Sequence, residues 1–302
     1  MLTNICSDWG MKEENILMVV TDGASNMVRG VELAFGKKKH SHCFAHLLNL
    51  MAQKTIESEE MPQLKVILDK VTGIVRWLKH SVVGSDALRK KTKDLEKKIL
   101  IQSIPTRWNS TYYMIERFLF LREQVSCVIA FNTSAPKMLD ADEVEILTEL
   151  MLLLRPIESA TRDVSGEKFI TSSVVIPMVK LLKRNIEKVA ITTELAAKVK
   201  EILLVQWGKR FSQIEKLHFF PIPTVLDPRF RTLHFEDKVA LAATLKKISA
   251  ELKKEEESSE SDYDRSSPPT AGNNESDTDH FSLWDDHDKL VQNSWKLKKR
   301  PN

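Results

Sequence analysis

Residues 15–53 read NILMVVTDGASNMVRGVELAFGKKKHSHCFAHLLNLMAQ, and this stretch decides the fold. An apolar run, Ile16–Val20, ends on Thr21 and Asp22, and a Gly-Ala-Ser-Asn turn follows. The unbroken apolar run predicts a strand buried on both faces, and the residues after the turn predict an amphipathic helix that ends at Gly36. A carboxylate at the end of such a strand is held rigidly beside a crevice. Asp22 is therefore a candidate metal ligand or general base.

Beyond Pro62 the sequence predicts helix almost throughout. Apolar residues recur three and four positions apart from Leu64 to Leu78, and Gly84 is expected to interrupt this pattern. Further helices are expected over residues 86–101, 107–128, 144–161, 171–189, 194–217 and 238–255. A strand buried on both faces needs neighbours, and the sequence offers almost none, so either other strands are missing or a partner completes the sheet. The predicted fold class is mainly α with a small α/β part.

Composition excludes several classes of protein. The chain is 42% hydrophobic and 29% charged, as is ordinary for a soluble protein. No apolar run approaches the roughly 20 residues that span a bilayer, so no membrane partner is expected. The N-terminus, MLTNICSDWG, does not resemble a secretory signal, and three widely spaced cysteines indicate a reducing compartment rather than a disulfide framework.

The net charge of +3 hides a strong asymmetry. Residues 255–288 contain twelve acidic residues and one basic residue, whereas residues 1–254 contain 30 acidic and 39 basic residues. A basic body with an acidic tail fits a polyanion-binding surface with a competing arm. The alternative is a solvated surface next to a disordered linker.

The C-terminal segment, residues 256–302, is predicted to be a disordered acidic tail with a basic C-terminus, because it can bury too little apolar surface. Phe281–Trp284 forms a small apolar cluster inside it. Ser259 and Ser261 each have an acidic residue three positions on, a weak kinase-site pattern. The terminal run Lys296–Pro301 resembles a nuclear localisation signal, so the expected location is the nucleus.

Five motifs in order resemble the hAT superfamily of DNA transposases, in particular its domesticated relatives that are associated with BED zinc fingers. The motifs cover roughly residues 1–255, and each is weak when it is taken alone. They are Val20–Met27 (VTDGASNM), Cys43–Leu50 (CFAHLLNL), Thr106–Thr111 (TRWNST), Ala160–Glu167 (ATRDVSGE) and Leu226–Phe230 (LDPRF).

The resemblance implies an RNase H-like catalytic domain that is interrupted by an all-helical insertion. The expected domains are a partial RNase H-like core over 1–58, the helical insertion over 59–255 and the tail over 256–302. In such transposases three carboxylates bind divalent metal and cut DNA by phosphoryl transfer, and Asp22 matches the second of them. The first would lie upstream of this sequence, and no third is recognised after the insertion. Neither a BED finger nor a dimerisation segment is recognised.

Two-metal chemistry needs several carboxylates to hold ions about 4 Å apart, which one carboxylate cannot do. The chain is therefore expected to be catalytically inactive, with Asp22 a relic carboxylate or simply an Asx turn. No cofactor is expected, and Mg²⁺ would bind only if an intact catalytic site existed. No small-molecule substrate is expected.

His46 lies beside the relic site according to the resemblance, and it forms a Cys-x-x-His pattern with Cys43. Zinc needs four ligands, and the other half of such a site is not visible. A family relic, or a buried cysteine with a satisfied histidine, is the favoured interpretation. The sequence therefore predicts no metal site.

Arg107 and Trp108 match the family's element that stacks on a flipped base at the cleaved DNA end. Stacking of an aromatic face on a base contributes about 1–3 kcal/mol and tolerates any base. Core packing competes evenly with this role, because Trp108 begins a helical apolar stripe. The loop Lys37-Lys38-Lys39 supplies candidate phosphate contacts, as does the group between Lys90 and Lys98, for which a solvated face is favoured.

The function predicted first is that of a catalytically inactive, transposase-derived nuclear protein that binds DNA and acts in transcription. The first alternative is a protein-interaction scaffold without DNA binding. The second is an active transposase whose missing carboxylates lie outside this chain. Protein partners or dimerisation are possible, because an incomplete sheet leaves an open edge.

Overall fold

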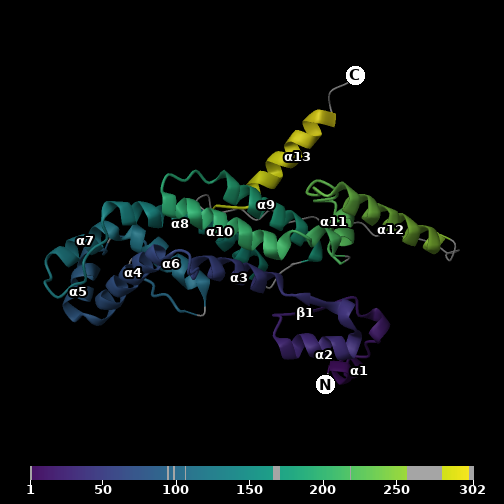
Figure 1. Ribbon diagram of the computed structural model, residues 1–302, viewed down its shortest axis with the longest axis horizontal. Helices are drawn as coiled ribbons and strands as arrows, with labels where there is room; N and C mark the ends of the chain where they lie inside the picture. Colours follow the sequence, from purple (N-terminus) through teal and green to yellow (C-terminus); the bar gives the residue numbers. More distant parts are fainter. Residues whose placement is uncertain are drawn as a thin grey trace. The chain divides into compact units, whose positions relative to one another are not determined.

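The computed structural model describes residues 2–93, 95–97, 99–105, 107–165, 171–217, 219–256 and 281–298. It confirms the predicted fold class, because the described residues are mostly helical and contain one sheet of two strands (Figure 1). The chain forms two compact units. Unit 1 comprises residues 1–169 and 182–212, and unit 2 comprises residues 170–181 and 213–302. The domain boundaries expected after residues 58 and 255 are a different division and stay a prediction.

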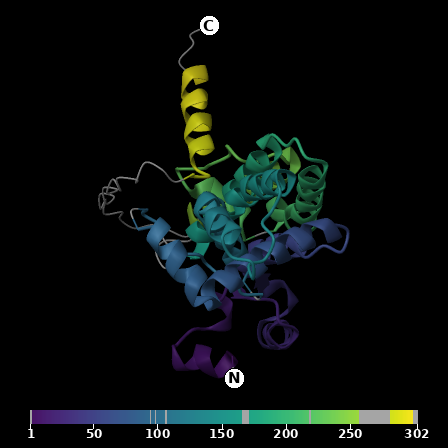
Figure 2. The same cartoon turned by 90° about the vertical axis from the view of Figure 1, so that its left-hand side faces the viewer.

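Unit 1 begins with the strands and their flanking helices. These elements are α1 (Leu2–Asp8), η1 (Glu13–Asn15), β1 (Val19–Thr21), α2 (Ser25–Phe35), η2 (Lys37–Lys39) and β2 (His40–His42). The helices that follow are α3 (Phe44–Ile56), α4 (Pro62–His80), α5 (Val82–Lys91), α6 (Trp108–Phe120), α7 (Arg122–Ala130), α8 (Ala141–Ser165) and α10 (Glu194–Phe211). Figure 2 looks onto the end of unit 1 that carries α4, α5 and α7.

Unit 2 is made of shorter helical elements. They are η3 (Ser172–Val174), η4 (Ile214–Lys216), α11 (Pro221–Leu226), α12 (Lys238–Glu256) and α13 (Asp285–Lys298). Helix α9 (Val175–Lys188) begins in unit 2 and ends in unit 1. Among the described residues no helix is long and apolar enough to cross a membrane.

The sheet corrects one prediction. Strand β1 starts at Val19 rather than at Ile16, and Val20 is 52% exposed, so burial on both faces was wrong. Strand β1 pairs in parallel with β2, and α2 packs against both strands. A sheet of two strands with one covering helix leaves its other side open. The apolar run predicted a covering layer of structure on each face of the sheet, but among the described residues only α2 covers a face.

The turn after β1 is fixed by local hydrogen bonds. The Asp22 carboxylate accepts a hydrogen bond from the Ala24 N–H (3.1 Å), and the Thr21 hydroxyl accepts one from the Gly23 N–H (3.2 Å). Gly23 has φ +87°, and a Cβ at this position would lie 2.4 Å from the His42 Nδ1 atom. The turn therefore requires glycine, both for its backbone angle and for the space that His42 occupies.

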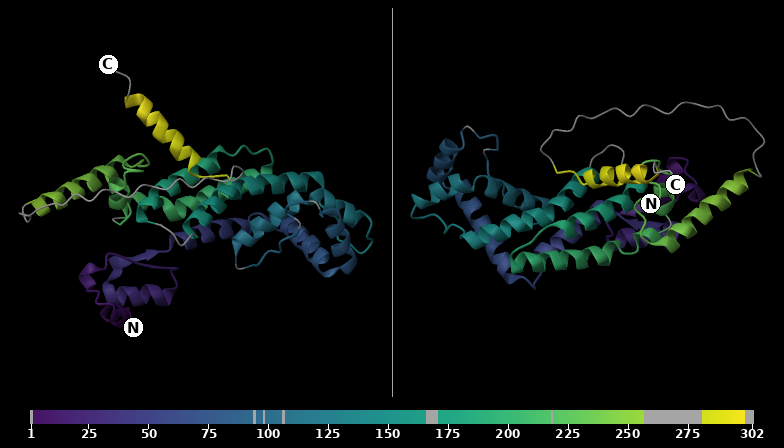
Figure 3. Two further views of the ribbon diagram at one scale, coloured as in Figure 1. Left: turned by 180° about the vertical axis from the view of Figure 1, so that it is seen from behind. Right: turned by 90° about the horizontal axis from the view of Figure 1, so that it is seen from above.

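Helix α8 is the common packing partner in unit 1. Helices α3, α6 and α10 all pack against it, and α10 also packs against α3 (Figure 3). The side chains of α8 that face these helices are completely buried, and they are Leu147, Leu150, Leu153, Leu154 and Ile157. Each buried side chain of this size contributes about 1.5–3 kcal/mol of transfer free energy. This apolar contact, rather than the sheet, is the main source of stability in unit 1.

Several helix boundaries differ from the predictions, and the helix expected over 194–217 ends at Phe211. The helix expected over 86–101 ends at Lys91, and the one expected over 107–128 is divided at Leu121 into α6 and α7. Gly84 does not interrupt a helix but lies in the first turn of α5, where a Cβ would be 2.8 Å from the Trp77 ring. This glycine is present because the helix approaches a tryptophan, a reason that the sequence pattern does not reveal.

The C-terminal segment also differs from the prediction of disorder over 256–302. Helix α13 lies within it, and Leu283, just before the helix, is completely buried. The average composition of this segment underestimated its tendency to be ordered, because two or three well-placed apolar side chains suffice to dock it. Residues 257–280, which include Ser259 and Ser261, lie outside the described residues, as do Lys299, Arg300 and Pro301 of the basic run. Thr106, Gly166 and Glu167 of the quoted motifs, and Lys98 of the lysine-rich group, lie outside them as well.

A buried carboxylate holds the start of α10 against α8. Glu149 is 7% exposed, and its two oxygens accept hydrogen bonds from the N–H and hydroxyl groups of Thr192 and Thr193 at 2.5–3.1 Å. Burial by itself would raise the pKa of Glu149, but these hydrogen bonds outweigh it and lower the pKa to about 2. The ionised carboxylate is thus part of the fold.

We predict that Glu149→Gln lowers the free energy of unfolding by about 2 kcal/mol at pH 7, because an amide cannot accept bonds on both sides. The pKa of Glu149 is lower in the folded state, so the carboxylate stabilises above its unfolded pKa and this stabilisation is lost as pH falls towards 2. The difference from the unsubstituted chain should therefore shrink with acidification. Glu145→Gln is the matched control, since Glu145 accepts a single bond, from the Thr192 hydroxyl. Urea melts between pH 7 and pH 3 measure both, and an equal loss in the two variants would contradict the assignment.

We also predict that Gly23→Ala destabilises the pairing of β1 with β2 by about 1 kcal/mol more than Gly36→Ala does. Both glycines have positive φ, but a Cβ at Gly36 meets open space. The readout is hydrogen exchange of the Cys43 amide, which donates to the Thr21 carbonyl. The opening constant should rise about fivefold more in Gly23→Ala. Equal exchange in the two variants would mean that His42 turns aside without cost.

Candidate nucleic-acid interface

Asp22 and Cys43 lie at the same edge of the sheet. The register pairs Thr21 with His42, and the Cys43 N–H donates to the Thr21 carbonyl at 2.6 Å. Because the strands are parallel, α2 and α3 both begin at this edge. Neither helix has a side-chain cap, since Ala24 and Cys43 occupy the N-cap positions without such a bond. The Asp22 carboxylate and the Asn26 side chain already accept the Ala24 and Met27 N–H groups, so the other N–H groups and the dipoles of the two helices are what favours an anion such as phosphate here.

The histidines near this edge make structural contacts within the sheet. His40 Nε2 lies 2.8 Å from the Thr21 hydroxyl, and the His40 and His42 rings meet edge to face at 5.0 Å. Burial lowers the pKa of His40, the neighbouring His42 lowers it further, and Glu32 opposes the change. His40 is therefore neutral at pH 7. His46 lies half-buried in the first turn of α3.

The residues at this edge do not fit a metal centre. Across the described part of the chain, no three His, Cys, Asp or Glu side chains come together in a group that could hold a metal ion. Asp22 is exposed and its carboxylate accepts the Ala24 N–H, as in an Asx turn. A two-metal site needs several carboxylates around one point, and zinc needs four donors. No step that depends on a bound metal can be derived from this set.

The three lysines lie at the opposite edge of the sheet from Asp22. They form η2, which leads into the start of β2, whereas Asp22 follows the end of β1. Lys37 and Lys38 are exposed. Lys39 donates from Nζ to the Glu13 carbonyl at 2.7 Å and so holds the segment before β1. The structure therefore leaves two ammonium groups available for phosphate and uses the third within the fold.

The Arg107–Trp108 pair lies at the start of α6, after a tight turn. The Ser110 hydroxyl accepts the Ile104 N–H at 2.7 Å and bonds the Arg107 carbonyl at 2.6 Å, which fixes that turn. Arg107 is exposed, whereas Trp108 is only 3% exposed and meets the Tyr112 ring at 6.4 Å. In this arrangement Trp108 is a core residue. Its role in base stacking stays a prediction, and this role would require the Trp108 ring to move out of the core.

The sequence analysis missed one buried polar contact between α6 and α8. The Tyr113 hydroxyl donates to Glu158 Oε1 at 2.7 Å, and Arg162 pairs with the same carboxylate at 3.2 Å. Burial, together with the Glu158 carboxylate, raises the pKa of Tyr113, so the phenol stays protonated. Glu158 stands two residues before the Ala160–Glu167 motif, and this position next to a motif is the one sequence feature that could have drawn attention to the contact. The contact joins two helices and offers no general base.

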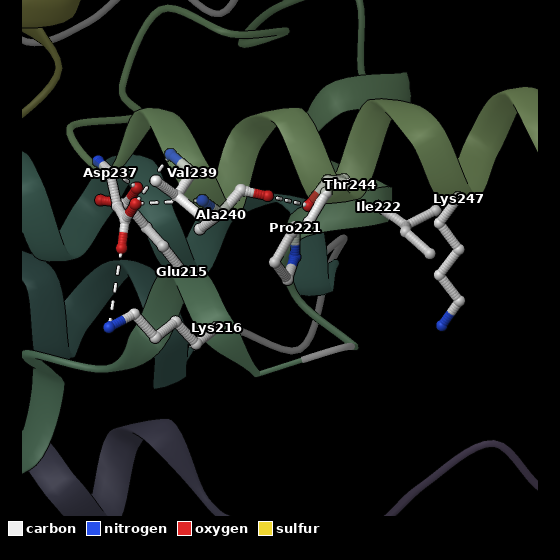
Figure 4. A pocket seen from close by; sticks show the side chains of 10 residues that line it. Glu215, Lys216, Pro221, Ile222, Asp237, Val239, Ala240, Thr244 and Lys247 are labelled. Carbon is white, nitrogen blue, oxygen red and sulfur yellow. Dashed lines mark hydrogen bonds and ion pairs between the residues drawn. The ribbon is translucent and has the colours of Figure 1, made fainter.

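A pocket of about 340 Å³ lies in unit 2, between η4, α11 and the start of α12 (Figure 4). Both of its carboxylates are already engaged. Glu215 pairs with the buried Lys180 at 2.6 Å, and Asp237 caps α12 by accepting the Val239 and Ala240 N–H groups. The pocket thus presents an apolar wall, and none of the predicted site residues lines it.

Comparison with known proteins gives one family model and two curated relatives to which the chain is similar. The family model described as the ZBED1 RNase-like helical domain matches residues 41–151, from β2 into α8. The chain is 26% identical over 229 residues to Zinc finger BED domain-containing protein 4 of Homo sapiens, which covers 74% of this chain and 19% of that protein. It is 23% identical over 205 residues to the Putative AC transposase of Zea mays, covering 65% and 24% respectively.

The chain spans about a fifth to a quarter of the length of these curated relatives. The region that the family model matches includes most of β2, α3, Arg107 and the start of α6 at Trp108. These matches show that the chain is similar to a hAT-type transposase and to zinc finger BED domain-containing proteins.

Proposed function

We propose that the chain is the DNA-binding part of a transposase-derived nuclear protein, and that it does not itself cut DNA. The observation that carries the proposal is the edge of the β1–β2 sheet, where two uncapped helix N-termini converge. Such termini bind phosphate through backbone N–H groups without reading base sequence. The similarity to a transposase suggests that the polyanion bound at this edge is DNA.

Exposed basic side chains away from this edge also favour binding of a polyanion. Arg107 projects from the turn before α6, and Lys37 and Lys38 project from η2. Each such contact neutralises one phosphate and releases counterions, so binding of this kind depends steeply on salt. The proposed nuclear location rests on the basic run Lys296–Pro301 in the sequence.

The proposed lack of cleavage rests on the surroundings of Asp22. In-line phosphoryl transfer with two metal ions needs several carboxylates directed at one point. Asp22 instead closes a turn with the Ala24 N–H, and the described residues supply no cluster of ligands around it. In this proposal Asp22 has a structural role at the end of β1.

A protein-binding role is the second candidate, and one surface favours it. The groove of about 490 Å³ beside α5 is lined in part by Leu78, Leu88 and Leu100. Ile99 at its rim is 73% exposed, and Val82 and Val83 at the start of α5 are 76% and 67% exposed. Clustered exposed apolar side chains are typical of protein-interaction surfaces.

We predict that the full chain shifts duplex DNA in a gel at low salt, and that affinity falls linearly with log salt. Lys37→Ala combined with Lys38→Ala should weaken binding and reduce the salt slope by about two, since two phosphate contacts are lost. The matched control is Lys90→Ala with Lys91→Ala, which removes the same charge from α5. Equal effects from both pairs would refute a specific interface at η2. No shift at any salt concentration would favour the protein-binding role.

We further predict that the purified chain does not nick terminal-inverted-repeat DNA in the presence of Mg²⁺ or Mn²⁺. The assay follows conversion of supercoiled plasmid that carries such repeats to the nicked form, with and without EDTA. Metal-dependent nicking that Asp22→Asn abolishes would disprove the proposal. Nicking that persists in Asp22→Asn would point to a contaminating nuclease.

A further inference from the structure

The turn that contains the LDPRF motif is unusually well braced. The Asp227 carboxylate accepts two bonds from the Arg229 guanidinium, at 3.0 and 2.7 Å, and one from the Ser173 hydroxyl at 2.7 Å. These bonds, with Arg229 the strongest contributor, outweigh burial and lower the pKa of Asp227 to about 2. Arg231 has φ +48°, a rare conformation for a residue with a side chain. Such a conformation persists only where the surroundings over-determine it, and it marks sites of binding or function.

The brace presents an aromatic platform. The Arg229 guanidinium lies 4.9 Å from the centre of the Phe230 ring. The Trp284 ring stacks on Phe230 at 5.7 Å with an interplanar angle of 28°. Trp284 comes from a segment more than fifty residues further along the chain, and its neighbour Leu283 is completely buried. Phe230 is 4% exposed, with the Trp284 ring stacked on it.

Two histidines complete the contact. His234 Nε2 lies 2.9 Å from His287 Nδ1, and the two rings stack at 5.1 Å. The His287 ring also meets Phe230 at 5.4 Å. Burial lowers the pKa of His287, Asp288 opposes this and Arg229 reinforces it, so the ring is neutral at pH 7. One imidazole therefore donates to the other, which gives the contact a directional hydrogen bond as well as stacking.

The docked segment has the form of a short linear motif. Phe281–His287 reads FSLWDDH, and it is separated from the end of α12 by 24 residues of sequence. Its anchors are one fully buried leucine and one stacked tryptophan, the side chains that dominate peptide interfaces. Asp285 and Asp286 follow in the first turn of α13, where carboxylates stabilise the helix dipole.

We propose that the braced turn Asp227–His234 is a peptide-binding site, that its ligand is a short segment of aromatic and acidic residues, and that the chain fills this site with its own Phe281–His287. The platform, the cation and the histidine are fixed by the body of unit 2, and the segment brings the complementary tryptophan, carboxylates and second histidine. The two partners meet as a receptor and a tethered ligand. The proposal does not depend on DNA binding.

The test uses the full chain with Trp284→Ala, which disables the tethered segment and leaves the turn intact. A labelled synthetic peptide of residues 281–298 is titrated into it, and binding is followed by fluorescence anisotropy. We expect binding with a dissociation constant near 10 µM. The unsubstituted chain should bind the peptide roughly 100-fold more weakly, because a tethered segment competes at an effective concentration of about 1 mM. Phe230→Ala together with Trp284→Ala should abolish binding.

Matched peptides separate docking from unspecific adhesion. A peptide with Trp284→Ala should lose binding, whereas one with Gln292→Ala, at an exposed position of α13, should bind like the unsubstituted peptide. The proposal is overturned if the Trp284→Ala chain melts cooperatively but takes up no peptide. It is equally overturned if both peptides or both receptor variants bind alike.

Hydrogen exchange of the unsubstituted chain gives a second measurement that needs no variant. A docked ligand detaches without unfolding the body, so the amides of residues 287–291 should exchange at least 100-fold faster than those buried in α12 contacts near Thr244. If both sets of amides exchange at the rate of global unfolding, the segment is an integral part of the core and the proposal is refuted. This outcome can be read even if the Trp284→Ala chain fails to fold.

Discussion

Helix α8 is the surface on which unit 1 is assembled, and its buried carboxylates decide how the neighbouring segments approach it. Glu149 can stay ionised at 7% exposure only while Thr192 and Thr193 direct their N–H and hydroxyl groups at it. Glu158 is buried at 5% and depends in the same way on Tyr113 and Arg162. A buried charge without such partners would cost several kcal/mol, so each carboxylate admits one arrangement of its neighbours. Apolar packing gives α8 its stability, and these two residues give it specificity.

The small sheet depends on the helices in a different way. Two strands of three residues have too few hydrogen bonds to be stable alone, and α2 covers one side of them. The parallel pairing nevertheless has a consequence for function, because it brings the starts of α2 and α3 to one edge. Asp22 lies there as a turn residue, and the backbone N–H groups beside it favour an anion.

Unit 2 carries the motif whose role was least evident from the residues. LDPRF looks like an ordinary turn, yet Asp227 and Arg229 brace it, and Phe230 becomes a platform for a tryptophan from a distant segment. The segment that docks there follows a run of acidic and small polar residues, which hides it from any average over composition. The same few side chains therefore explain both the form of the turn and the order of the segment.

The fold class, the positions of most helices and the similarity to transposases and BED zinc finger proteins are all evident in the amino-acid sequence. Apolar residues at a period near 3.6 identified helices such as α4 and α8, because burying such a stripe is the only way to remove it from water. The conspicuous glycine at position 23 indicated a turn, and the motif order indicated the relatives. These properties depend on neighbouring residues or on the order of motifs along the chain, so they can be recognised without knowledge of the tertiary contacts.

Tertiary structure alone decided which side chains are available. Trp108 stands at the start of a helix, where it could face either way, and packing against Tyr112 turned it inward while Arg107 stayed exposed. Parallel pairing placed Lys37 and Lys38 at the edge opposite Asp22, although they are near in sequence. Contact with Trp77 explains Gly84, and docking on Phe230 explains the order of α13. Each of these outcomes depends on a partner far along the chain, and a pattern of neighbouring residues cannot contain that information.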